Sequence, residues 1–410
     1  MLRHHLFLVM GLGIMGMSCS KEKTENPTPS PTDFFVYWSK PVDSGYPSHL
    51  GMPLQFRSDY VAFFADQNTD HGYVKFRDPD SGALVGRWSD FLPSNGYRGW
   101  NMESVQTPDG DLILNDNDNY AIYRVGPPVQ GQPPMTRWSH YFPEGIVRDD
   151  FAYEGNELFV AVNEFNTGSR QKSSILRSPA DQPNFDTVLK FYAQPGWEVQ
   201  VFSPMVCTNS EGDRLLIGKK IETAQGQYRF GIVAYNLDLE AVEWSVDSLE
   251  STATPTGGVV SGMVEQDGVL YALGGAHVFA LDVDAGTRLW TYRPAETQVT
   301  FTEGSLLCSG DYVYAKAFDQ ELYCIHKSSG VQHWKVLIGT SHSKPIAEFG
   351  NYLYYCRDGL YAVHKTSGAV RTWMPPVGSR WFYQNPVFDP ATGKMYVASA
   401  TLIHCIQSLP

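Results

Sequence analysis

Cysteine is scarce in this sequence, and the spacings that would give it a chemical role are missing. The chain has 6 cysteines among 410 residues, with no adjacent pair and no Cys-x-x-Cys spacing. This pattern argues against a disulfide framework and against a thioredoxin-like redox site. Five of the cysteines stand singly on apolar, strand-like runs, where a cysteine is usually a small buried side chain: Cys207, Cys308, Cys324, Cys356 and Cys405.

Positive charge and catalytic signatures are also lacking. The 31 Lys and Arg residues are outnumbered by 44 Asp and Glu residues, which gives a formal net charge of −13. Such a surface repels nucleic acid, so no nucleic-acid partner is expected. The sequence contains no Gly-x-Ser-x-Gly elbow and no His-Glu-x-x-His motif. No catalytic residue, cofactor or metal is therefore predicted, and whether the protein is an enzyme stays open.

No apolar run is long enough to span a bilayer. After a short basic start, residues 6–17 form an apolar stretch of about a dozen residues, the length of a signal-peptide core. The sequence Gly16-Met17-Ser18-Cys19 resembles the cleavage box of bacterial lipoproteins, in which Cys19 would receive the lipid. Gly16 departs from that box, which usually has Leu or Val at this position. An ordinary signal peptide with an incidental cysteine is the alternative.

The segment after Cys19 differs in character from the rest of the chain. Residues 20–32 are polar and rich in proline, so they bury too little apolar surface to fold. We therefore expect a signal peptide at residues 1–18 and a lipidated cysteine with a disordered tether at residues 19–33. Residues 34–410 would then form one domain held at a membrane surface.

Three segments in the C-terminal half repeat one pattern: residues 269–290, 312–334 and 352–373. Each reads as a strand, a turn, a second strand, a glycine turn and a strand that ends in tryptophan. The second strands show the alternation that is typical of sheets. The glycines of the following turns, Gly286, Gly330 and Gly368, would supply the positive φ of a tight reversal.

This pattern resembles the PQQ-like repeat, which is shared by quinoprotein dehydrogenases and by the propeller lipoprotein of the outer-membrane barrel-assembly machinery. Looser copies occupy residues 60–88, 112–138, 158–191 and 215–244. The resemblance implies an all-β protein in which each copy forms one four-stranded blade of a β-propeller.

The ends of the domain predict how the propeller closes. The last copy, residues 385–406, has no outermost strand, and residues 34–38 at the other end have the missing sequence. We expect this N-terminal strand to complete the last blade, because closure removes exposed sheet edges. Eight blades then have outer strands that end in large aromatic residues, which we interpret as packing residues between blades: Trp38, Trp88, Trp138, Phe191, Trp244, Trp290, Trp334 and Trp373. Seven blades remain an alternative if the copy at residues 158–191 is misread.

Irregular sequence gathers on one face of the predicted ring. In a four-stranded blade, the turn between the second and third strands and the connection to the next blade lie on the same face. We call this face the loop-rich rim; it includes residues 66–71, 115–119, 163–172 and 219–228. The opposite rim should have tight glycine turns, with long connections only at residues 126–135 and 178–186. Residues 115–119 alternate Asn and Asp and could ligate calcium, but a hairpin turn is the favoured interpretation.

Three tryptophans outside the repeat pattern, Trp100, Trp197 and Trp381, each precede an innermost strand on the loop-rich rim. An aromatic ring can stack on a sugar while neighbouring polar groups bind its hydroxyls. Filling of gaps between blades is the alternative role. The predicted ligand-binding residues are Arg98, Trp100, Asn101, Trp197, Glu198, Gln200, Arg380, Trp381, Tyr383, Gln384 and Asn385.

The resemblance leaves several functions open. Quinoprotein dehydrogenases carry a vicinal Cys-Cys pair and an Asp base near calcium, and no residues here match that site. Resemblance to the barrel-assembly lipoprotein implies a scaffold that docks other envelope proteins. We expect a monomeric, non-catalytic lipoprotein in the envelope of a Gram-negative bacterium, anchored to the periplasmic or surface side of the outer membrane. Its propeller would bind a glycan or another polar ligand, or else dock a protein partner.

Overall fold

The computed structural model describes residues 34–41, 54–65, 73–90, 104–116, 120–129, 132–143, 145–166, 169–252, 262–296, 299–339, 346–375, 386–399 and 401–410. These residues form β-strands joined by turns and connections. In this part of the chain, no helix is long and apolar enough to cross a membrane.

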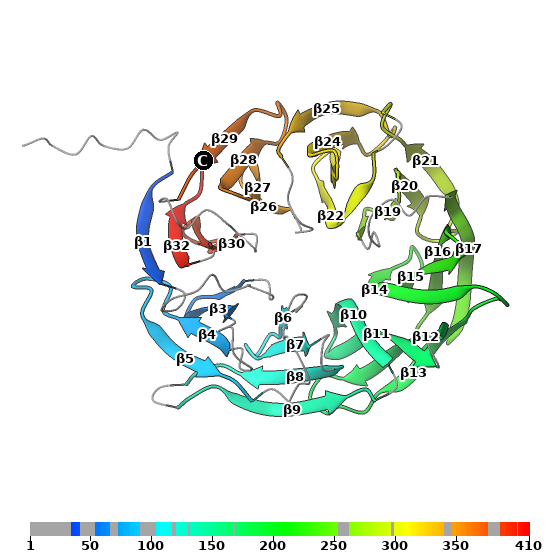
Figure 1. The fold of residues 1–410 in the computed structure, drawn as a ribbon, viewed down its shortest axis with the longest axis horizontal. Helices are drawn as coiled ribbons and strands as arrows, with labels where there is room; N and C mark the ends of the chain where they lie inside the picture. The colour runs from blue at the N-terminus through cyan, green and yellow to red at the C-terminus, as the bar shows by residue number, and fades with distance from the viewer. Residues whose placement is uncertain are drawn as a thin grey trace, which may run out of the picture.

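The strands form eight antiparallel sheets of four strands each, arranged around a ring (Figure 1). Blade 1 has β2 (Gln55–Arg57), β3 (Tyr60–Ala65), β4 (Tyr73–Arg77) and β5 (Leu84–Trp88). Blade 2 has β6 (Ser104–Gln106), β7 (Leu112–Asp116), β8 (Ala121–Gly126) and β9 (Met135–Tyr141). Blade 3 has β10 (Gly145–Glu154), β11 (Glu157–Asn166), β12 (Ser169–Pro179) and β13 (Asp186–Tyr192). Blade 4 has β14 (Glu198–Thr208), β15 (Arg214–Ala224), β16 (Gln227–Asn236) and β17 (Ala241–Thr252).

The second half of the ring follows the same order. Blade 5 has β18 (Met263–Gln266), β19 (Val269–Gly274), β20 (His277–Asp282) and β21 (Arg288–Tyr292). Blade 6 has β22 (Phe301–Ser309), β23 (Tyr312–Ala317), β24 (Glu321–His326) and β25 (Gln332–Leu337). Blade 7 has β26 (Ala347–Phe349), β27 (Tyr352–Cys356), β28 (Leu360–His364) and β29 (Val370–Trp373). Blade 8 has β30 (Val387–Phe388), β31 (Lys394–Ala398), β32 (Leu402–Gln407) and, from the other end of the domain, β1 (Val36–Pro41).

The N-terminal strand closes the ring, as predicted. β1 pairs antiparallel with β32, with Trp38 opposite Cys405, and blade 8 has the strand order β1-β32-β31-β30. The copy around residue 158 forms the complete blade 3, so the protein has eight blades and the seven-bladed alternative is wrong. Blades 8 and 1 are also linked by an ion pair between Lys394 and Asp80 at 2.7 Å.

The core lies between the blades rather than at the centre of the ring. All six residues of β8 are buried, whereas the outer strand β9 alternates between exposed and half-buried residues. Apolar side chains of adjacent blades pack face to face, as Tyr60 and Phe76 of blade 1 do with Leu112 of blade 2.

Outer-strand tryptophans join each of five blades to the next. The Nε1 of Trp244 donates to the carbonyl oxygen of Val283 in blade 5 at 2.8 Å. Its ring lies against Gly286, where a Cβ atom would come within 2.5 Å. The packing role predicted for these tryptophans is thus observed. The same indole-to-carbonyl bond joins Trp38 to Pro79, Trp138 to Ala180, Trp290 to Lys327 and Trp334 to Lys365.

The junction of blades 1 and 2 lacks this contact. In blade 5, Trp290 pairs with Ala280, which lies two residues before Asp282, the first residue of the glycine turn. The equivalent residue of blade 1 is Phe76, and its partner is Gly86 instead of a tryptophan. The predicted outer-strand residue Trp88 lies two positions further along.

Other side chains occupy the place of the missing indole. A Cβ atom at Gly86 would lie 3.0 Å from Pro134 and 3.1 Å from Pro128, so the long connection between β8 and β9 packs directly on this glycine. Trp88 is buried and donates from Nε1 to the hydroxyl of Thr136 at 2.9 Å. The first two blades are therefore joined by this connection and by Trp88.

Blades 3 and 4 have the longest strands. Those of blade 4 have 10 to 12 residues, whereas the strands of blades 1 and 5 have between 3 and 6. Blade 4, in green, extends beyond the edge of the ring (Figure 1). Its β15–β16 hairpin turns at Gln225 and Gly226, which both have positive φ, of 46° and 80°.

Candidate binding surfaces of the propeller

Most of the predicted ligand-binding residues lie outside the described residues. These are Arg98, Trp100, Asn101, Arg380, Trp381, Tyr383, Gln384 and Asn385, and Cys19 lies outside as well. Trp197, Glu198 and Gln200 are described. They lie at the start of β14, the innermost strand of blade 4, on the loop-rich rim as expected.

Trp197 is held in place by the connection that precedes β14. Its backbone N–H donates to the carbonyl oxygen of Gln194 at 2.9 Å, and its own carbonyl accepts from the side-chain amide of Gln171 at 3.2 Å. Gly196, with φ +81°, makes the turn into the tryptophan. The ring is half-buried, and Glu198 beside it is half-buried too.

An arginine from a different strand completes this part of the rim. The guanidinium of Arg229, in β16, lies 4.0 Å from the centroid of the Trp197 ring. Stacking of this kind is attractive and holds a flexible arginine in one orientation. The sequence did not single out Arg229, because it lies 32 positions after Trp197 in the middle of a hairpin. Only the pairing of β14 with β15, and of β15 with β16, brings the two together.

A buried hydrogen-bond network fixes β14 against blade 3. The side chain of Asn163 accepts from the backbone N–H of Val201 at 2.8 Å and donates to its carbonyl oxygen at 3.0 Å. The hydroxyl of Ser173 lies 2.7 Å from the side-chain oxygen of Asn163 and 2.9 Å from the carbonyl oxygen of Val199, and its one proton is shared between these two acceptors. Gln200, between these two valines, is only 7% exposed. Trp197 and Glu198 therefore stand on a rigid base.

The part of blade 4 that extends from the ring has an apolar cluster of its own. Phe202, Ile221 and Phe230 are buried together, with Tyr228 packed against them. Lys220 pairs with Asp247 at 2.7 Å across the same sheet. The hydrogen bond from Lys220 lowers the pKa of the Asp247 carboxyl, so this carboxylate is ionised at neutral pH. We call this projecting part of blade 4, residues 219–230 with Trp197, the blade 4 platform.

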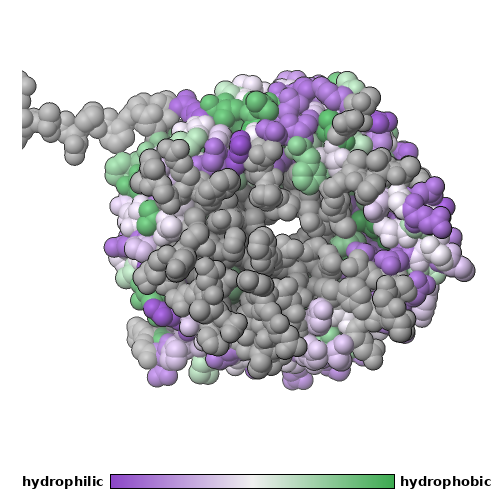
Figure 2. All heavy atoms as spheres, viewed as in Figure 1, coloured by the Kyte–Doolittle hydropathy of each residue, from purple (hydrophilic) through white to green (hydrophobic). Residues whose placement is uncertain are grey.

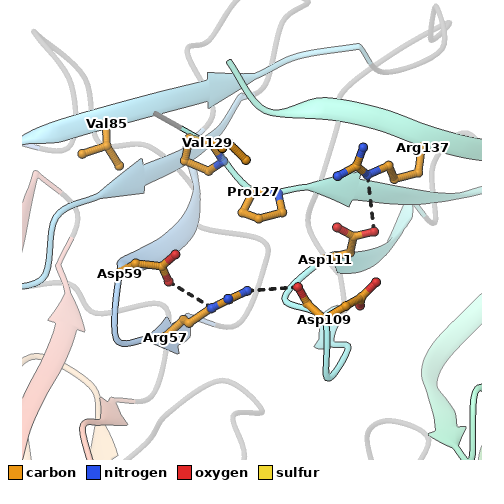
Figure 3. Close-up of a pocket in the computed structure, with 9 residues that line it drawn as sticks. Arg57, Asp59, Val85, Asp109, Asp111, Pro127, Val129 and Arg137 are labelled. Atoms are coloured by element: carbon orange, nitrogen blue, oxygen red, sulfur yellow. Dashed lines mark hydrogen bonds and ion pairs between the residues drawn. The ribbon is translucent and has the colours of Figure 1, made fainter. Parts of the chain in front are cut away.

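A second concave surface lies on the opposite rim, between blades 1 and 2. It is an open cavity of about 830 Å³ beside Gly86. It is bounded on one side by the β2–β3 turn and on the other by the β6–β7 turn and the β8–β9 connection (Figure 3). Its lining residues are Arg57, Asp59, Val85, Asp109, Asp111, Pro127, Pro128, Val129 and Arg137.

Arginine and aspartate side chains form ion pairs around this cavity. Arg124 lies behind it, only 8% exposed, and contacts Asp111 at 2.7 Å and Asp109 at 2.6 Å. Arg57 contacts Asp59 at 3.0 Å, and Arg137 lies 3.5 Å from Asp111. The pKa of the Asp109 carboxyl is lowered, first by the hydroxyl of Thr107 that donates to it. Each of the three carboxylates at the cavity is thus paired with an arginine.

The cysteines and candidate metal ligands form no reactive site in the described part of the chain. Cys207, Cys308, Cys324, Cys356 and Cys405 are free thiols, and all but the half-buried Cys308 are buried. Burial raises the pKa of Cys207 to about 12 and that of Cys405 to about 11, so these thiols stay protonated. Among the described residues, no three His, Cys, Asp or Glu side chains are grouped as a metal site. Residues 117–119 of the Asn/Asp run lie outside that part.

Known proteins resemble this chain in repeat and in fold. The family model described as outer membrane protein assembly factor BamB matches residues 188–373, from β13 to β29. The crystal structure of BamB from Moraxella catarrhalis aligns with a TM-score of 0.57 and 12% identity, over 92% of this chain and 98% of that one. The computationally designed protein Ika8 aligns with a TM-score of 0.56 and 12% identity, over 88% of this chain and 97% of that one. No curated protein sequence matches the chain.

The repeat pattern of the sequence, the ring of blades and these matches all indicate a β-propeller. The family match begins in the outer strand of blade 3 and covers the blades in which the glycine and tryptophan pattern is clearest. The structural matches extend the likeness in fold to nearly the whole ring. Residues 188–373 therefore match a family of PQQ-like repeats, and the described part of the chain folds as an eight-bladed β-propeller.

Proposed function

We propose that this protein is a non-catalytic docking scaffold of the bacterial envelope, which holds a partner protein on its blade 4 platform. The observation that carries the proposal is the platform itself. Its strands extend beyond the ring, and its apolar cluster of Phe202, Ile221 and Phe230 makes the extension rigid. The closure of the ring does not need this extension, since blade 5 closes the same kind of junction with strands of 4 to 6 residues.

The surface of the platform suits a folded, water-soluble partner. Arg229 stacks on Trp197, and Tyr228 packs beside Phe230, so aromatic groups and a fixed cation lie together. Tryptophan, tyrosine and arginine are the residue types that dominate binding energy at protein interfaces. The outer edge of blade 4 carries mostly hydrophilic and neutral residues on the visible face (Figure 2). A small anchor with a polar surround is typical of interfaces that form and separate.

The likeness to BamB supports a partner in outer-membrane protein assembly. The matching family is described as an outer membrane protein assembly factor. We propose that this chain acts in the same process, anchored to the outer membrane through a lipid on Cys19 after removal of residues 1–18. Residues 19–33 would then serve as the tether, and residues 34–410 as one monomeric scaffold domain.

Gene deletion with complementation tests this function. Loss of the gene should lower the amount of folded outer-membrane β-barrel protein, measured by heat-modifiable mobility on gels. The wild type should restore the level and Arg229→Glu should not. Arg87→Glu is the matched control, because Arg87 also lies over an aromatic ring, Tyr73, at 6.0 Å but on blade 1. Unchanged barrel protein in the deletion strain would contradict a role in assembly.

Glycan binding on the loop-rich rim is the second candidate. It is favoured by the Trp197–Arg229 stack, because an oriented guanidinium beside an aromatic ring can bind hydroxyl groups of a sugar. In this proposal, Trp197, Glu198 and Gln200 act together with Arg98, Trp100, Asn101, Arg380, Trp381, Tyr383, Gln384 and Asn385. A glycan array probed with wild type and with Trp197→Ala tests it. Binding that is lost in the variant supports the candidate, and an array without any hit contradicts it.

A further inference from the structure

The cavity between blades 1 and 2 arises from a local departure from the repeat. Where blade 5 has Trp290, blade 1 has Gly86, so no indole fills the junction on the opposite rim. The β8–β9 connection covers Gly86 with Pro128 and Pro134 but leaves about 830 Å³ open beside them. A cavity of this size is within the range of ligand sites in proteins.

One wall of the cavity is aliphatic. Val85 of β5 is 45% exposed and Val129 of the β8–β9 connection is 61% exposed, with Pro127 and Pro128 next to it. Figure 3 shows Val85, Val129 and Pro127 along one side of the cavity and Arg57 and Asp59 along the other. None of the described lining residues is aromatic, so this wall suits aliphatic side chains and offers no stacking surface for a sugar ring.

Both arginines that line the cavity have N–H donors for which the described residues supply no acceptor. A guanidinium has five N–H groups. Among the described residues, Arg57 contacts only Asp59 and the carbonyl oxygen of Asp109, and Arg137 contacts only Asp111. The carboxylates, in contrast, are each paired with an arginine. A ligand that fits must therefore bring acceptor oxygens to Arg57 and Arg137.

Of these two donors, Arg57 is held in position by the fold. Arg57 lies directly over the backbone of Gly110, where any Cβ atom would overlap its guanidinium. Gly110 has φ +91°, and its carbonyl oxygen accepts from the hydroxyl of the buried Tyr60 at 2.8 Å. Behind this turn, Arg124 is fixed by Asp111 and by the carbonyl of Ala180 in blade 3 at 2.8 Å. Binding would thus cost little further ordering of the Arg57 side chain.

We propose that this cavity binds an extended peptide segment of a partner protein that presents a carboxylate side chain beside aliphatic ones. The carboxylate would accept from Arg57 and Arg137, and the aliphatic side chains would pack on Val85 and Val129. Backbone N–H groups of the segment would donate to the exposed oxygens of Asp59 and Asp109, which are 55% and 61% exposed. This inference extends the scaffold function to a second surface, on the rim opposite the blade 4 platform.

Fluorescence anisotropy with the full chain tests the proposal. The probe is a fluorescein-labelled pentapeptide, Val-Glu-Leu-Glu-Val, with blocked ends, and the control probe has Lys in place of Glu. Arg137→Gln and Val85→Asp should each weaken binding of the Glu probe about tenfold. Arg177→Gln and Val370→Asp are the matched controls. Arg177, like Arg137, has one acidic partner at a long distance, Glu157 at 3.7 Å. Val370, on the outer strand of blade 7, is 37% exposed and so resembles Val85.

Each outcome decides for or against the site. Saturable binding of the Glu probe, with losses at Arg137 and Val85 and less than about a twofold change at the control positions, supports it. No saturable binding, equal binding of the Lys probe, or equal losses at the control positions would overturn it. Displacement of the peptide by cellohexaose would also overturn it, in favour of a glycan site. Because the readout is direct binding, it does not depend on the Arg229 complementation result that tests the scaffold function.

Discussion

Trp244 of blade 4 and Gly286 of blade 5 are in direct contact across the blade junction. The indole lies over the glycine, where a Cβ atom would come within 2.5 Å of its ring, and its Nε1 donates to the carbonyl oxygen of Val283 at 2.8 Å. In blades 1, 5, 6 and 7 the glycine of this turn thus has two roles, since it allows the positive φ of the turn and leaves room for the tryptophan of the preceding blade.

The first prediction separates these two roles. Gly286→Ala should lower the free energy of unfolding by about 3 to 4 kcal/mol, because alanine is strained at φ +66° and would also displace the Trp244 ring. Gly310→Ala is the control, since Gly310 has φ +54° and no atom near a Cβ position. It should cost only about 1 to 2 kcal/mol. Urea denaturation measures both, and equal losses would show that the tryptophan contact adds nothing.

At a junction without tryptophan, we expect glycine at this turn position to stabilise the protein, and Glu240 allows this to be tested. It has φ 52° at the position of blade 4 that corresponds to Gly286. In blade 3 the tryptophan position is occupied by Leu189, which pairs with Ile175 just before the bulge, as Trp290 pairs with Ala280 in blade 5. Without an indole to accommodate, a side chain fits there, but its backbone is strained. Glu240→Gly should therefore raise the free energy of unfolding by up to about 1 kcal/mol. A clear destabilisation of this variant in the same denaturation assay would contradict this explanation.

His404 should make stability depend on pH. It is fully buried in blade 8 between the hydroxyls of Ser39 and Ser399, and burial lowers its pKa from 6.5 to about 4. The folded protein therefore keeps the ring neutral where the unfolded chain takes up a proton. This contribution to stability is complete above about pH 6.5 and is lost as the pH falls towards 4, about 3 kcal/mol in all.

The comparison with His404→Asn isolates this contribution from that of the carboxylates. The loss of unfolding free energy between pH 7 and pH 4 should be about 3 kcal/mol smaller in the variant than in the wild type. An identical pH dependence in both proteins would mean that His404 does not titrate differently in the folded and unfolded states.

The closure of the ring by β1 predicts a sharp dependence on where the chain starts. Removal of residues 1–41 should leave the edge of β32 from Leu402 to Ile406 unpaired and cause aggregation. Removal of residues 1–33 is the control and should leave a stable monomer. Size-exclusion chromatography and thermal melting distinguish the two. A monomer of unchanged stability after the longer deletion would rule out the closure.

The sequence was sufficient for the fold because one pattern recurs. Alternating strands, glycine turns and terminal aromatic residues identified all eight outer strands, including β13 with Phe191 and the distant β1. The copies that looked degenerate still formed blades, since burial between neighbours needs only apolar residues of about the right size.

The sites were harder to predict, because they depend on departures from the repeat. Trp88 matched the pattern by type, and only the register shows that Gly86 pairs with Phe76 and occupies the tryptophan position. The importance of Arg229 likewise depends on strand pairing, which places it over Trp197. The strand position that a single residue occupies depends on the register of pairing, and the periodic pattern of the sequence does not reveal that register.

Site-specific photo-crosslinking in living cells tests the scaffold function most directly. A benzophenone side chain at Gln227, at the tip of the β15–β16 hairpin, is compared with one at Glu211, in the β14–β15 turn on the opposite rim of the same blade. Our account predicts an adduct with an outer-membrane assembly protein from position 227 that is absent from position 211 and is lost when Arg229→Glu is added. No adduct from position 227, or the same adducts from both positions, would contradict the claim that the blade 4 platform docks a partner.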